Sequence, residues 1–247
     1  MFLHQLNCCS RSNANRKCSK LLGGTLKIYQ PRSSQTKENM ATTASKTKGK
    51  IGILIEEHFD EIEFRAFNEF FPANGYEVEY ISHLWNQEQL TFKGIDLTEE
   101  VTVTVEVNNI EPTDYEGILL IGAYAMDRLR YEEHHKEGQP NQSPAVRFLR
   151  KAVKAMDAGR LKIGTICHSL WLFCADPELL KNREVTCAHN IICDVQNAGG
   201  IIIFNGDGTK DLHIDGNLIT AKHPNVVAEF MNIFLKAIKE QQLQVVT

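Results

Sequence analysis

Beyond residue 50 the sequence alternates between short apolar runs and longer amphipathic segments, and this alternation constrains the fold more than any other feature. Four runs have the length and composition of strands, at residues 51–55, 76–81, 117–121 and 162–166. An unbroken apolar run such as Ile51–Ile55 suits a strand that is buried on both faces of a parallel sheet. Strands that alternate with helices predict an α/β domain, with helices on both faces of a mainly parallel sheet.

Three amphipathic segments predict the helices of this domain. The first follows Asp60 and carries apolar residues at helical spacing until Pro72 and Gly75 close it. The second begins at Ser143, a preferred N-cap residue, and has Pro144 at its first helical position. The third covers about residues 225–240, where apolar residues again recur at helical spacing.

The remaining segments predict a ribbon, turns and a loop. Val101–Val105 alternates strictly between apolar and polar residues, which is typical of an exposed ribbon strand. Asp207–Gly208 and Asp215–Gly216 are turn signals, and the second is expected inside a hairpin. Residues 131–143 are polar throughout and predict a loop. Because this part of the chain has no linker and no internal repeat, we expect one domain over residues 50–245.

Residues 1–49 differ in composition from the rest of the chain. The first 50 residues hold ten Lys or Arg and one acid, Glu38, which leaves 17 basic and 30 acidic residues in the remainder. The segment is rich in Ser, Thr, Asn and Gln and has no sustained period, so we expect a disordered basic extension. Its composition permits a mitochondrial transit peptide. The alternatives are an extension without a targeting role and a second start at Met40.

The composition of the body excludes several classes of function. An acidic body lacks the basic face that nucleic-acid phosphates require, so we expect no nucleic-acid partner. No apolar stretch approaches the roughly 18–20 residues of a membrane-spanning helix, so no membrane partner is expected. The seven cysteines are odd in number and unevenly spaced. They predict free thiols in a reducing compartment, and we expect a cytoplasmic protein unless the extension directs it to mitochondria.

Cys167 is the strongest candidate for a reactive side chain. It follows the predicted strand at 162–166 directly, and a sharp turn from strand to helix presents a nucleophile to solvent. The N-terminus of a following helix would lower the pKa of the thiol. Backbone N–H groups after the cysteine and at Gly122–Ala123 would bind a developing oxyanion. The alternative for a cysteine in this place is a small buried apolar residue.

No metal or cofactor site is predicted. His134 and His135 lie in the polar loop, and adjacent histidines rarely share one metal ion. Cys174, Cys187 and Cys193 lack the paired spacing of a zinc site, so buried structural thiols are expected. The sequence also has no glycine-rich phosphate-binding motif, which argues against a nucleotide cofactor.

Several segments in the same order carry a resemblance to a known family. Residues 155–169, which read AMDAGRLKIGTICHS, closely resemble the cysteine elbow of the PfpI-type family. These are the intracellular protease I proteins of the class I glutamine amidotransferase-like superfamily, which also holds the Parkinsonism-associated deglycase. Further matches lie at residues 59–63, 114–123, 196–200 and 214–224. The resemblance covers nearly all of residues 50–240. It implies a flavodoxin-like three-layer sandwich and a homodimer or larger assembly.

The functional residues of that family fall on matching positions of this chain. The elbow cysteine corresponds to Cys167, and the histidine that follows it in the protease-like branch corresponds to His168. The carboxylate of the first helix that contacts the thiol corresponds to Glu63. The resemblance implies that Cys167 is the nucleophile and that the other two move protons. A carboxyl that stays protonated there needs a pKa raised by burial. The alternative for Glu63 is a solvated helix carboxylate.

The predicted oxyanion and substrate pocket adds Gly122, Ala123, Ser169 and His189. The family pattern has two glycines where this chain has Gly122 and Ala123, and it has a glycine where this chain has Ser169. Ala123 still offers its N–H, provided that its backbone angles suit a residue with a Cβ atom. Trp171, near the elbow, is expected to pack in the core.

These observations favour a cysteine-dependent enzyme that acts on reactive carbonyls, such as methylglyoxal or early glycation adducts, or on amide bonds. Addition of a thiol to an aldehyde needs no activated leaving group, so of the reactions considered it requires the fewest catalytic groups. One alternative is a non-catalytic thiol sensor or stress-protective, chaperone-like protein, because a low-pKa cysteine is prone to oxidation. Another is a scaffold that binds a protein through the 131–143 loop. Whether Glu132 or Glu133 lends an acidic group across a subunit interface stays open.

Overall fold

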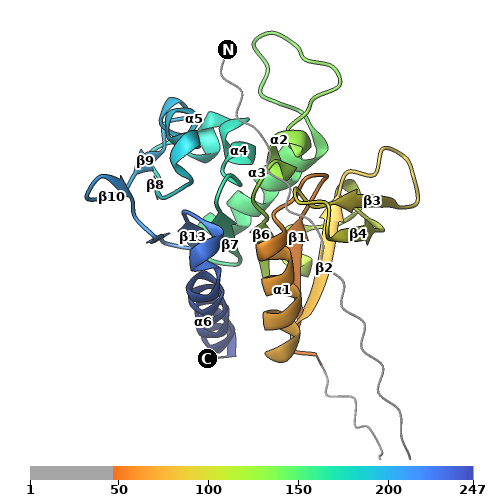
Figure 1. The fold of residues 1–247 in the computed structure, drawn as a ribbon, viewed down its shortest axis with the longest axis vertical. Coiled ribbons are helices and arrows are strands. Elements are labelled where there is room, and N and C mark those ends of the chain that lie inside the picture. Colours follow the sequence, from red (N-terminus) through yellow and green to blue (C-terminus); the bar gives the residue numbers. More distant parts are fainter. Residues whose placement is uncertain (1–46, 247) are drawn as a thin grey trace, which may run out of the picture. The chain divides into compact units, whose positions relative to one another are not determined.

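The runs predicted as strands form the centre of a seven-stranded sheet (Figure 1). The structure is a computed structural model that describes residues 47–246. Neighbouring strands are parallel throughout the sheet except for the antiparallel pair β12–β13 at one edge. In spatial order the strands are β12 (Leu212–Asp215), β13 (Leu218–Ala221), β7 (Lys162–Ile166), β6 (Gly117–Leu120), β1 (Lys50–Leu54), β2 (Glu77–Ser82) and β5 (Val105–Glu106).

Helices cover both faces of this sheet and complete a three-layer α/β sandwich of the flavodoxin type. The long helices α1 (Glu61–Ala73) and α6 (Val227–Val246) lie side by side on one face (Figure 1). The opposite face carries α3 (Pro144–Asp157) with the short helices α2 (Ala125–Leu129) and α4 (Trp171–Cys174). The predicted fold class is therefore confirmed.

Glycines in two central strands let α6 approach the sheet. A Cβ atom on Gly117 would lie 2.7 Å from Cζ of Phe234, and one on Gly164 would lie 2.8 Å from Cζ of Phe230. Both phenylalanines are completely buried, and Phe234 also meets Phe71 of α1 edge-on at 6.4 Å. The two strand glycines contribute no side chain to the core, and the absence of a Cβ atom allows α6 to pack closely on the sheet.

Capping of α1 fixes the residues that begin its first turn. The Asp60 side chain accepts hydrogen bonds from the backbone N–H groups of Ile62 and Glu63, both at 3.0 Å, as expected for an aspartate N-cap. At the other end, Pro72 lies inside the last turn, and the helix ends at Ala73, between Pro72 and Gly75, the two residues predicted to close it. The cap places Glu63 at the carboxyl edge of the sheet, because α1 begins where the connection from β1 ends.

The predicted hairpin is present, but the predicted ribbon strand at 101–105 is divided, because Val105 belongs to β5 of the main sheet. β3 (Leu90–Lys93) and β4 (Glu100–Val103) form an antiparallel ribbon outside the main sheet, and β12–β13 turn at Gly216, whose φ is +59°. Smaller elements complete the chain: β8 (Glu184–Val185), α5 (Ile192–Asn197), β9 (Ile201–Ile202), β10 (Phe204–Asn205) and β11 (Gly208–Thr209). Short 3-10 helices lie at Val107–Asn109, Pro112–Asp114, Pro177–Leu179, His189–Ile191 and Pro224–Val226.

The 131–143 segment has no helix or strand, as predicted, and it projects as a long loop between α2 and α3 (Figure 1). Glu132 closes the base of this loop, since its carboxylate accepts a hydrogen bond from the Gln142 N–H at 2.8 Å. In the described range 47–246, no helix is both long enough and apolar enough to cross a membrane. The predictions of a disordered extension and a transit peptide fall on residues 1–49, nearly all outside the described residues.

Candidate active site

Cys167 occupies a strained turn directly after β7. Its φ is +60°, a left-handed conformation that costs a residue with a Cβ atom about 1–2 kcal/mol. The backbone is held on both sides, because its N–H donates to the carbonyl of Ala221 at 2.9 Å and its carbonyl accepts from Ala188 at 3.1 Å. The turn directs the side chain toward the carboxyl end of β6, where 6% of the residue remains exposed.

Glu63 lies beside this cysteine and is sealed from solvent. Its Oε2 accepts a hydrogen bond from the Gly122 N–H at 2.6 Å, whereas Oε1 has no hydrogen-bond partner among the described residues. A Cβ atom on Gly122 would lie 2.7 Å from Oε1 of Glu63 and 2.9 Å from Cβ of Cys167. Gly122 therefore lies against both Glu63 and Cys167, and a side chain there would disturb both. The prediction of Gly122 as an oxyanion donor is wrong, because its N–H already donates to Glu63.

Complete burial raises the pKa of Glu63 well above its ordinary value of 4.5, and the negative charge of Asp60 raises it further. The single hydrogen bond from Gly122 opposes this change but does not offset it. Glu63 therefore keeps its proton at pH values where an exposed carboxyl has lost it. A protonated carboxyl is a hydrogen-bond donor, and Glu63 lies close enough to Cys167 for its charged form to raise the pKa of the thiol.

Burial also raises the pKa of the Cys167 thiol, to about 12, and a charged Glu63 contributes to this. The backbone N–H groups of Ala123 and His168 face the sulfur and oppose the increase. Protonation of Glu63 removes the second cause but leaves burial in place. The prediction of a lowered thiol pKa is wrong for the resting site. The helix expected to lower it, α4, has four residues and begins only at Trp171, too short and too distant to favour a thiolate.

His168 provides the proton acceptor for this thiol. Its Nδ1 lies 3.0 Å from Sγ of Cys167. Partial burial lowers the pKa of His168, although Asn190 and Asp60 oppose this, so the imidazole is neutral near pH 7 and able to accept a proton. Tyr124 stacks on the ring at 6.4 Å, and Trp171 lies against it at 5.0 Å. Trp171 thus packs at the edge of the core and also forms a wall of the site.

Ala123 supplies its N–H from a left-handed conformation, with φ at +56°. The family glycine would adopt this conformation without strain, whereas alanine requires support from its surroundings. That support comes from the connection after β1, because Phe59 pairs with Ala123 and the Tyr124 N–H donates to the His58 carbonyl at 3.1 Å. The departure at position 123 therefore preserves the donor geometry.

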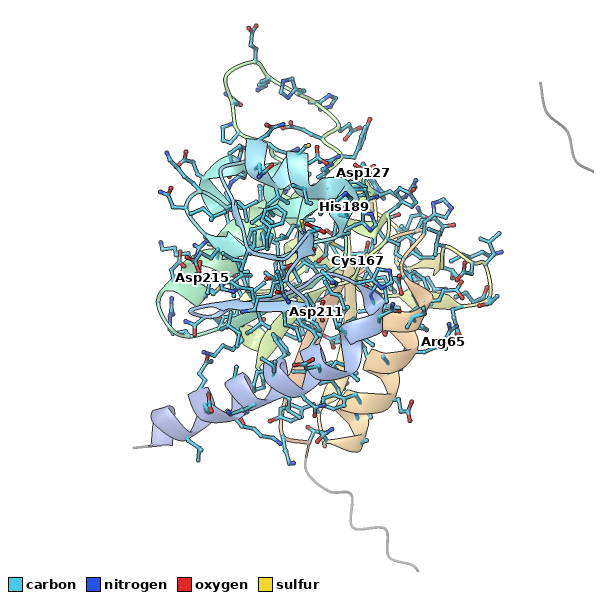
Figure 2. All side chains as sticks on the ribbon, turned by 60° about the vertical axis from the view of Figure 1, so that its left-hand side comes forward. Arg65, Asp127, Cys167, His189, Asp211 and Asp215 are labelled. Atoms are coloured by element: carbon cyan, nitrogen blue, oxygen red, sulfur yellow. The ribbon has the colours of Figure 1, made fainter. Side chains whose placement is uncertain are left out.

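A cavity of about 730 Å³ opens above the cysteine. Cys167, His168 and Ala123 line it, and so does the exposed His189, which Figure 2 shows near Cys167. The prediction for Ser169 is wrong. Its side chain is fully buried, and its hydroxyl accepts a hydrogen bond from the Ile166 N–H at 2.7 Å, which turns it away from the cavity.

Sequence reasoning missed several residues that line the same cavity. Asp60 was predicted only as a helix cap, yet its carboxylate also lies near His168 and His223. Lys222 and Asn190 also line the cavity; Lys222 lies in the matched segment 214–224 but was not singled out there, and no motif distinguishes Asn190 in the sequence. Within residues 47–246, no group of three or more His, Cys, Asp or Glu side chains is arranged to hold a metal ion.

Comparison with known proteins identifies the family of this chain. The family model of the DJ-1/PfpI family matches residues 49–237. The chain belongs to the DJ-1/PfpI family. An uncharacterised protein of Staphylococcus epidermidis is 26% identical over 190 residues, which cover 77% of this chain and 98% of the relative. An uncharacterised protein of Staphylococcus haemolyticus is also 26% identical over the same share of both chains.

Solved structures of DJ-1/PfpI proteins share the fold. The Drosophila melanogaster DJ-1beta structure has a TM-score of 0.59 and 15% identity, and the match covers 80% of this chain and 97% of that one. A ThiJ/PfpI domain protein of Brachyspira murdochii has a TM-score of 0.62 and 14% identity over 79% and 99% of the two chains. A two-domain protein of Anabaena variabilis, with DJ-1/ThiJ/PfpI-like and ferritin-like domains, has a TM-score of 0.63 and 24% identity. That match covers 78% of this chain and 48% of the larger protein.

Proposed function

We propose that this chain is a cysteine-dependent enzyme that acts on small reactive carbonyl compounds, with Cys167 as the nucleophile. One arrangement carries the proposal. Sγ of Cys167 lies 3.0 Å from Nδ1 of His168, and the nearby buried carboxyl of Glu63 has one oxygen, Oε1, without a hydrogen-bond partner in the described part of the chain. A nucleophile, a base and a proton-bearing carboxyl thus meet at one cavity, where an oxyanion can also be stabilised.

The first step is addition of the thiol to an aldehyde. His168 Nδ1 takes the thiol proton while Sγ forms a bond to the carbonyl carbon, and the carbonyl π electrons move to its oxygen. The N–H groups of Ala123 and His168 stabilise the resulting oxyanion. His168 then returns the proton to this oxygen, which yields a neutral hemithioacetal. Because the base acts during addition, the step needs no preformed thiolate, in agreement with the raised pKa of Cys167.

With a 2-oxoaldehyde such as methylglyoxal, the hemithioacetal can rearrange to a thioester. The carbon-bound hydrogen moves from the first carbon to the second, and the hydroxyl hydrogen moves from the first oxygen to the second. His168, neutral again, carries the carbon-bound proton. Water then cleaves the thioester to lactate and returns the hydrogen to the sulfur. The overall reaction adds one water molecule and needs no oxidant or reductant.

Glu63 contributes by holding a proton next to the sulfur. A hydrogen bond from the protonated carboxyl stabilises negative charge on sulfur whenever the carbon–sulfur bond forms or breaks. The same donor also serves amide or glycation-adduct substrates, where a thiolate must leave at the end of the cycle. The site therefore supports the wider class of carbonyl and amide substrates, and small aldehydes make the least demand on it.

Conversion of methylglyoxal to lactate tests this proposal. Cys167→Ala should abolish it, whereas Cys193→Ala, a change at an exposed cysteine on α5, should leave it within twofold of the parent. Circular dichroism confirms that both variants are folded. Undiminished activity in Cys167→Ala would refute the proposal. No turnover by the parent on any carbonyl substrate, together with two oxygen atoms added to Cys167 by mild peroxide, would favour the redox-sensor alternative.

The assembly state is a further part of the proposal. We expect a homo-oligomer, as the family resemblance implies. Light scattering of the purified chain measures its mass directly, and a monomer at micromolar concentration would contradict the expectation.

A further inference from the structure

A second cavity, of about 340 Å³, lies at the carboxyl ends of β1 and β2, between these strands and α2. We call it the Arg128 cavity. Its walls include Glu56, Trp85, Arg128, Tyr131 and Pro144, and none of its lining residues also lines the cysteine cavity. An adjoining space of about 250 Å³ shares the two aromatic residues and Pro144 with it. Ligands of open α/β sheets bind at this edge of the sheet.

A buried carboxylate positions the guanidinium of Arg128. Glu56 is 7% exposed and accepts hydrogen bonds from the Ser82 hydroxyl at 3.2 Å and from Nε of Arg128 at 3.4 Å. Burial raises the pKa of Glu56, and Arg128 and Ser82 both oppose this by stabilising its charged form. The Nη1 and Nη2 atoms of Arg128 form no hydrogen bond with the described residues, and the side chain is half exposed. Arg128 therefore presents a free pair of donors that matches a carboxylate.

Two exposed aromatic rings face each other beside this guanidinium. Trp85 and Tyr131 are 40% and 59% exposed, with ring centroids 6.0 Å apart. Trp85 and Asn86 have φ angles of +52° and +64°, and the Gln87 N–H donates to the Leu84 carbonyl at 2.9 Å. Left-handed residues without glycine are costly and cluster at binding sites. This turn holds a large apolar ring open to solvent, where it can contact a planar ligand.

Most of the other charged groups around the cavity are already paired within the chain, which leaves Arg128 as its available cation. Pro144 is the first residue of α3, a helix of 14 residues, so the positive end of the helix dipole faces this region. Asp127 carries a negative charge, but Arg130 already pairs with it, with Nε at 2.9 Å from Oδ1. His83 contacts Glu106 at 3.2 Å. In the adjoining space, Glu132 accepts a hydrogen bond from the Gln142 N–H, and Arg147 donates to the Gln142 carbonyl. Glu133 and His134 also line this space and are exposed.

We propose that the Arg128 cavity binds a small carboxylate with a planar, aromatic body. The carboxylate lies on Nη1 and Nη2 of Arg128, and the planar body lies against Trp85 and Tyr131. The rings provide apolar contact with the ligand body, and the guanidinium selects ligands with a negative charge. Many small-molecule sites combine an apolar lining with one charged group in this way. This site is separate from the cysteine cavity and does not depend on the reaction proposed there.

The two tryptophans of the chain, Trp85 and Trp171, allow a direct test. In Trp171→Phe, Trp85 is the only tryptophan, so its fluorescence reports on the Arg128 cavity. Titration with benzoate should give a saturable change, and benzyl alcohol and benzylamine should bind at least about tenfold more weakly. In Trp85→Phe, the remaining Trp171 should show no saturable response. No saturable response to benzoate in Trp171→Phe, or tighter binding of benzylamine, would overturn the proposal.

Variants of Arg128 in the Trp171→Phe background test the anion contact itself. Arg128→Gln should weaken benzoate binding by about tenfold, which corresponds to ~1.4 kcal/mol, and should leave benzyl alcohol unchanged. Arg128→Lys keeps the charge but loses the paired donors, so an intermediate loss is expected. Arg160→Gln, a change at another exposed arginine, is the matched control and should have no effect. Unchanged benzoate affinity in a folded Arg128→Gln variant would exclude the assignment.

Discussion

Glu61 and Glu63 begin the same helix and are both sealed from solvent, yet their surroundings change their acidity in opposite directions. Burial raises the pKa of Glu61, but hydrogen bonds from Thr98 and the Glu99 backbone, with the charge of Arg65, lower it overall. Its carboxylate accepts the Thr98 N–H at 2.9 Å and the Thr98 hydroxyl. Glu63 has one donor, the Gly122 N–H, and its pKa is raised.

The contrast follows from the geometry of the helix. Residues two positions apart on a helix point in nearly opposite directions, so Glu61 faces the β3–β4 ribbon and Glu63 faces the cysteine elbow. On the ribbon side the chain supplies enough donors to hold a carboxylate. On the elbow side it supplies one, and the second oxygen is left beside the sulfur. A fully satisfied carboxylate stabilises the fold, whereas a half-satisfied one retains a proton that chemistry can use.

The largest expected effect is a difference in catalytic activity between variants of Glu63 and Glu61. Glu63→Gln keeps the shape of the side chain and an acceptor for the Gly122 N–H, but it has no acidic proton. We expect kcat/KM for methylglyoxal to fall by at least about 100-fold, within the range for loss of a positioned proton donor. Glu61→Gln, the matched control, should stay within about threefold of the parent. Equal losses in both variants would show that Glu63 acts only through the fold.

Two glycines provide the second test, because each lies directly against one of these carboxyl groups and has no room for a side chain. A Cβ atom on Gly122 would lie 2.7 Å from Oε1 of Glu63, and one on Gly94 would overlap the side chain of Glu61. Gly122→Ala should therefore lower kcat/KM by about tenfold or more. Gly94→Ala should leave kcat/KM nearly unchanged and lower the free energy of unfolding by about 1–3 kcal/mol, the usual cost of overpacking. Wild-type activity in Gly122→Ala would contradict the geometry of the site.

The sequence predicted the elements that carry both carboxyls but not the difference between them. The Asp60 cap and the helical spacing after it were sufficient to predict α1, and the family resemblance identified Glu63. Apart from that resemblance, no local pattern distinguishes Glu61 from Glu63, because their donors come from residues 98 and 122, which only the folded sheet brings close. Acidity depends on such long-range contacts, so it follows from the tertiary structure rather than from the motif.

The errors at the elbow have the same physical origin. The lowered thiol pKa assumed a long helix after Cys167, but the chain turns for three residues before a four-residue helix begins. Ser169 was placed in the pocket because it replaces a family glycine, yet its hydroxyl satisfies the Ile166 N–H inside the turn. Burial decided the outcome at Cys167 and a local hydrogen bond decided it at Ser169, and periodicity carries no information about either.

The third test concerns stability. Glu61→Gln removes the charge that strengthens two hydrogen bonds from Thr98 and the ion pair with Arg65 at 3.5 Å. The free energy of unfolding at neutral pH should fall by about 1–3 kcal/mol, as expected for hydrogen bonds to a charged group. Urea denaturation measures this difference. Thr98→Val, which keeps the backbone donor, should cost less. An unchanged free energy of unfolding in Glu61→Gln would show that these hydrogen bonds add nothing to stability.

The smallest expected effect is a difference in how stability depends on pH. Glu61 has a lowered pKa, so it releases its proton more readily in the folded than in the unfolded chain. Its contribution is complete above about pH 4.5, the ordinary pKa, and is lost as the pH falls through the lowered value. Glu63 has a raised pKa, so the folded chain binds its proton more tightly. Its effect on stability is most favourable below pH 4.5 and declines as the pH rises.

Difference curves isolate these two contributions. The free energy of unfolding of the parent minus that of Glu61→Gln should rise with pH across the region near 4.5. The same difference for Glu63→Gln should fall with pH, because the variant has no ionised form to destabilise it. Urea denaturation at several pH values between about 2.5 and 8 gives both curves from one set of proteins, because the Glu61 change lies below its ordinary pKa of 4.5. Slopes of the same sign would mean that the two carboxyls ionise alike, and the assignment of a retained proton to Glu63 would then fail.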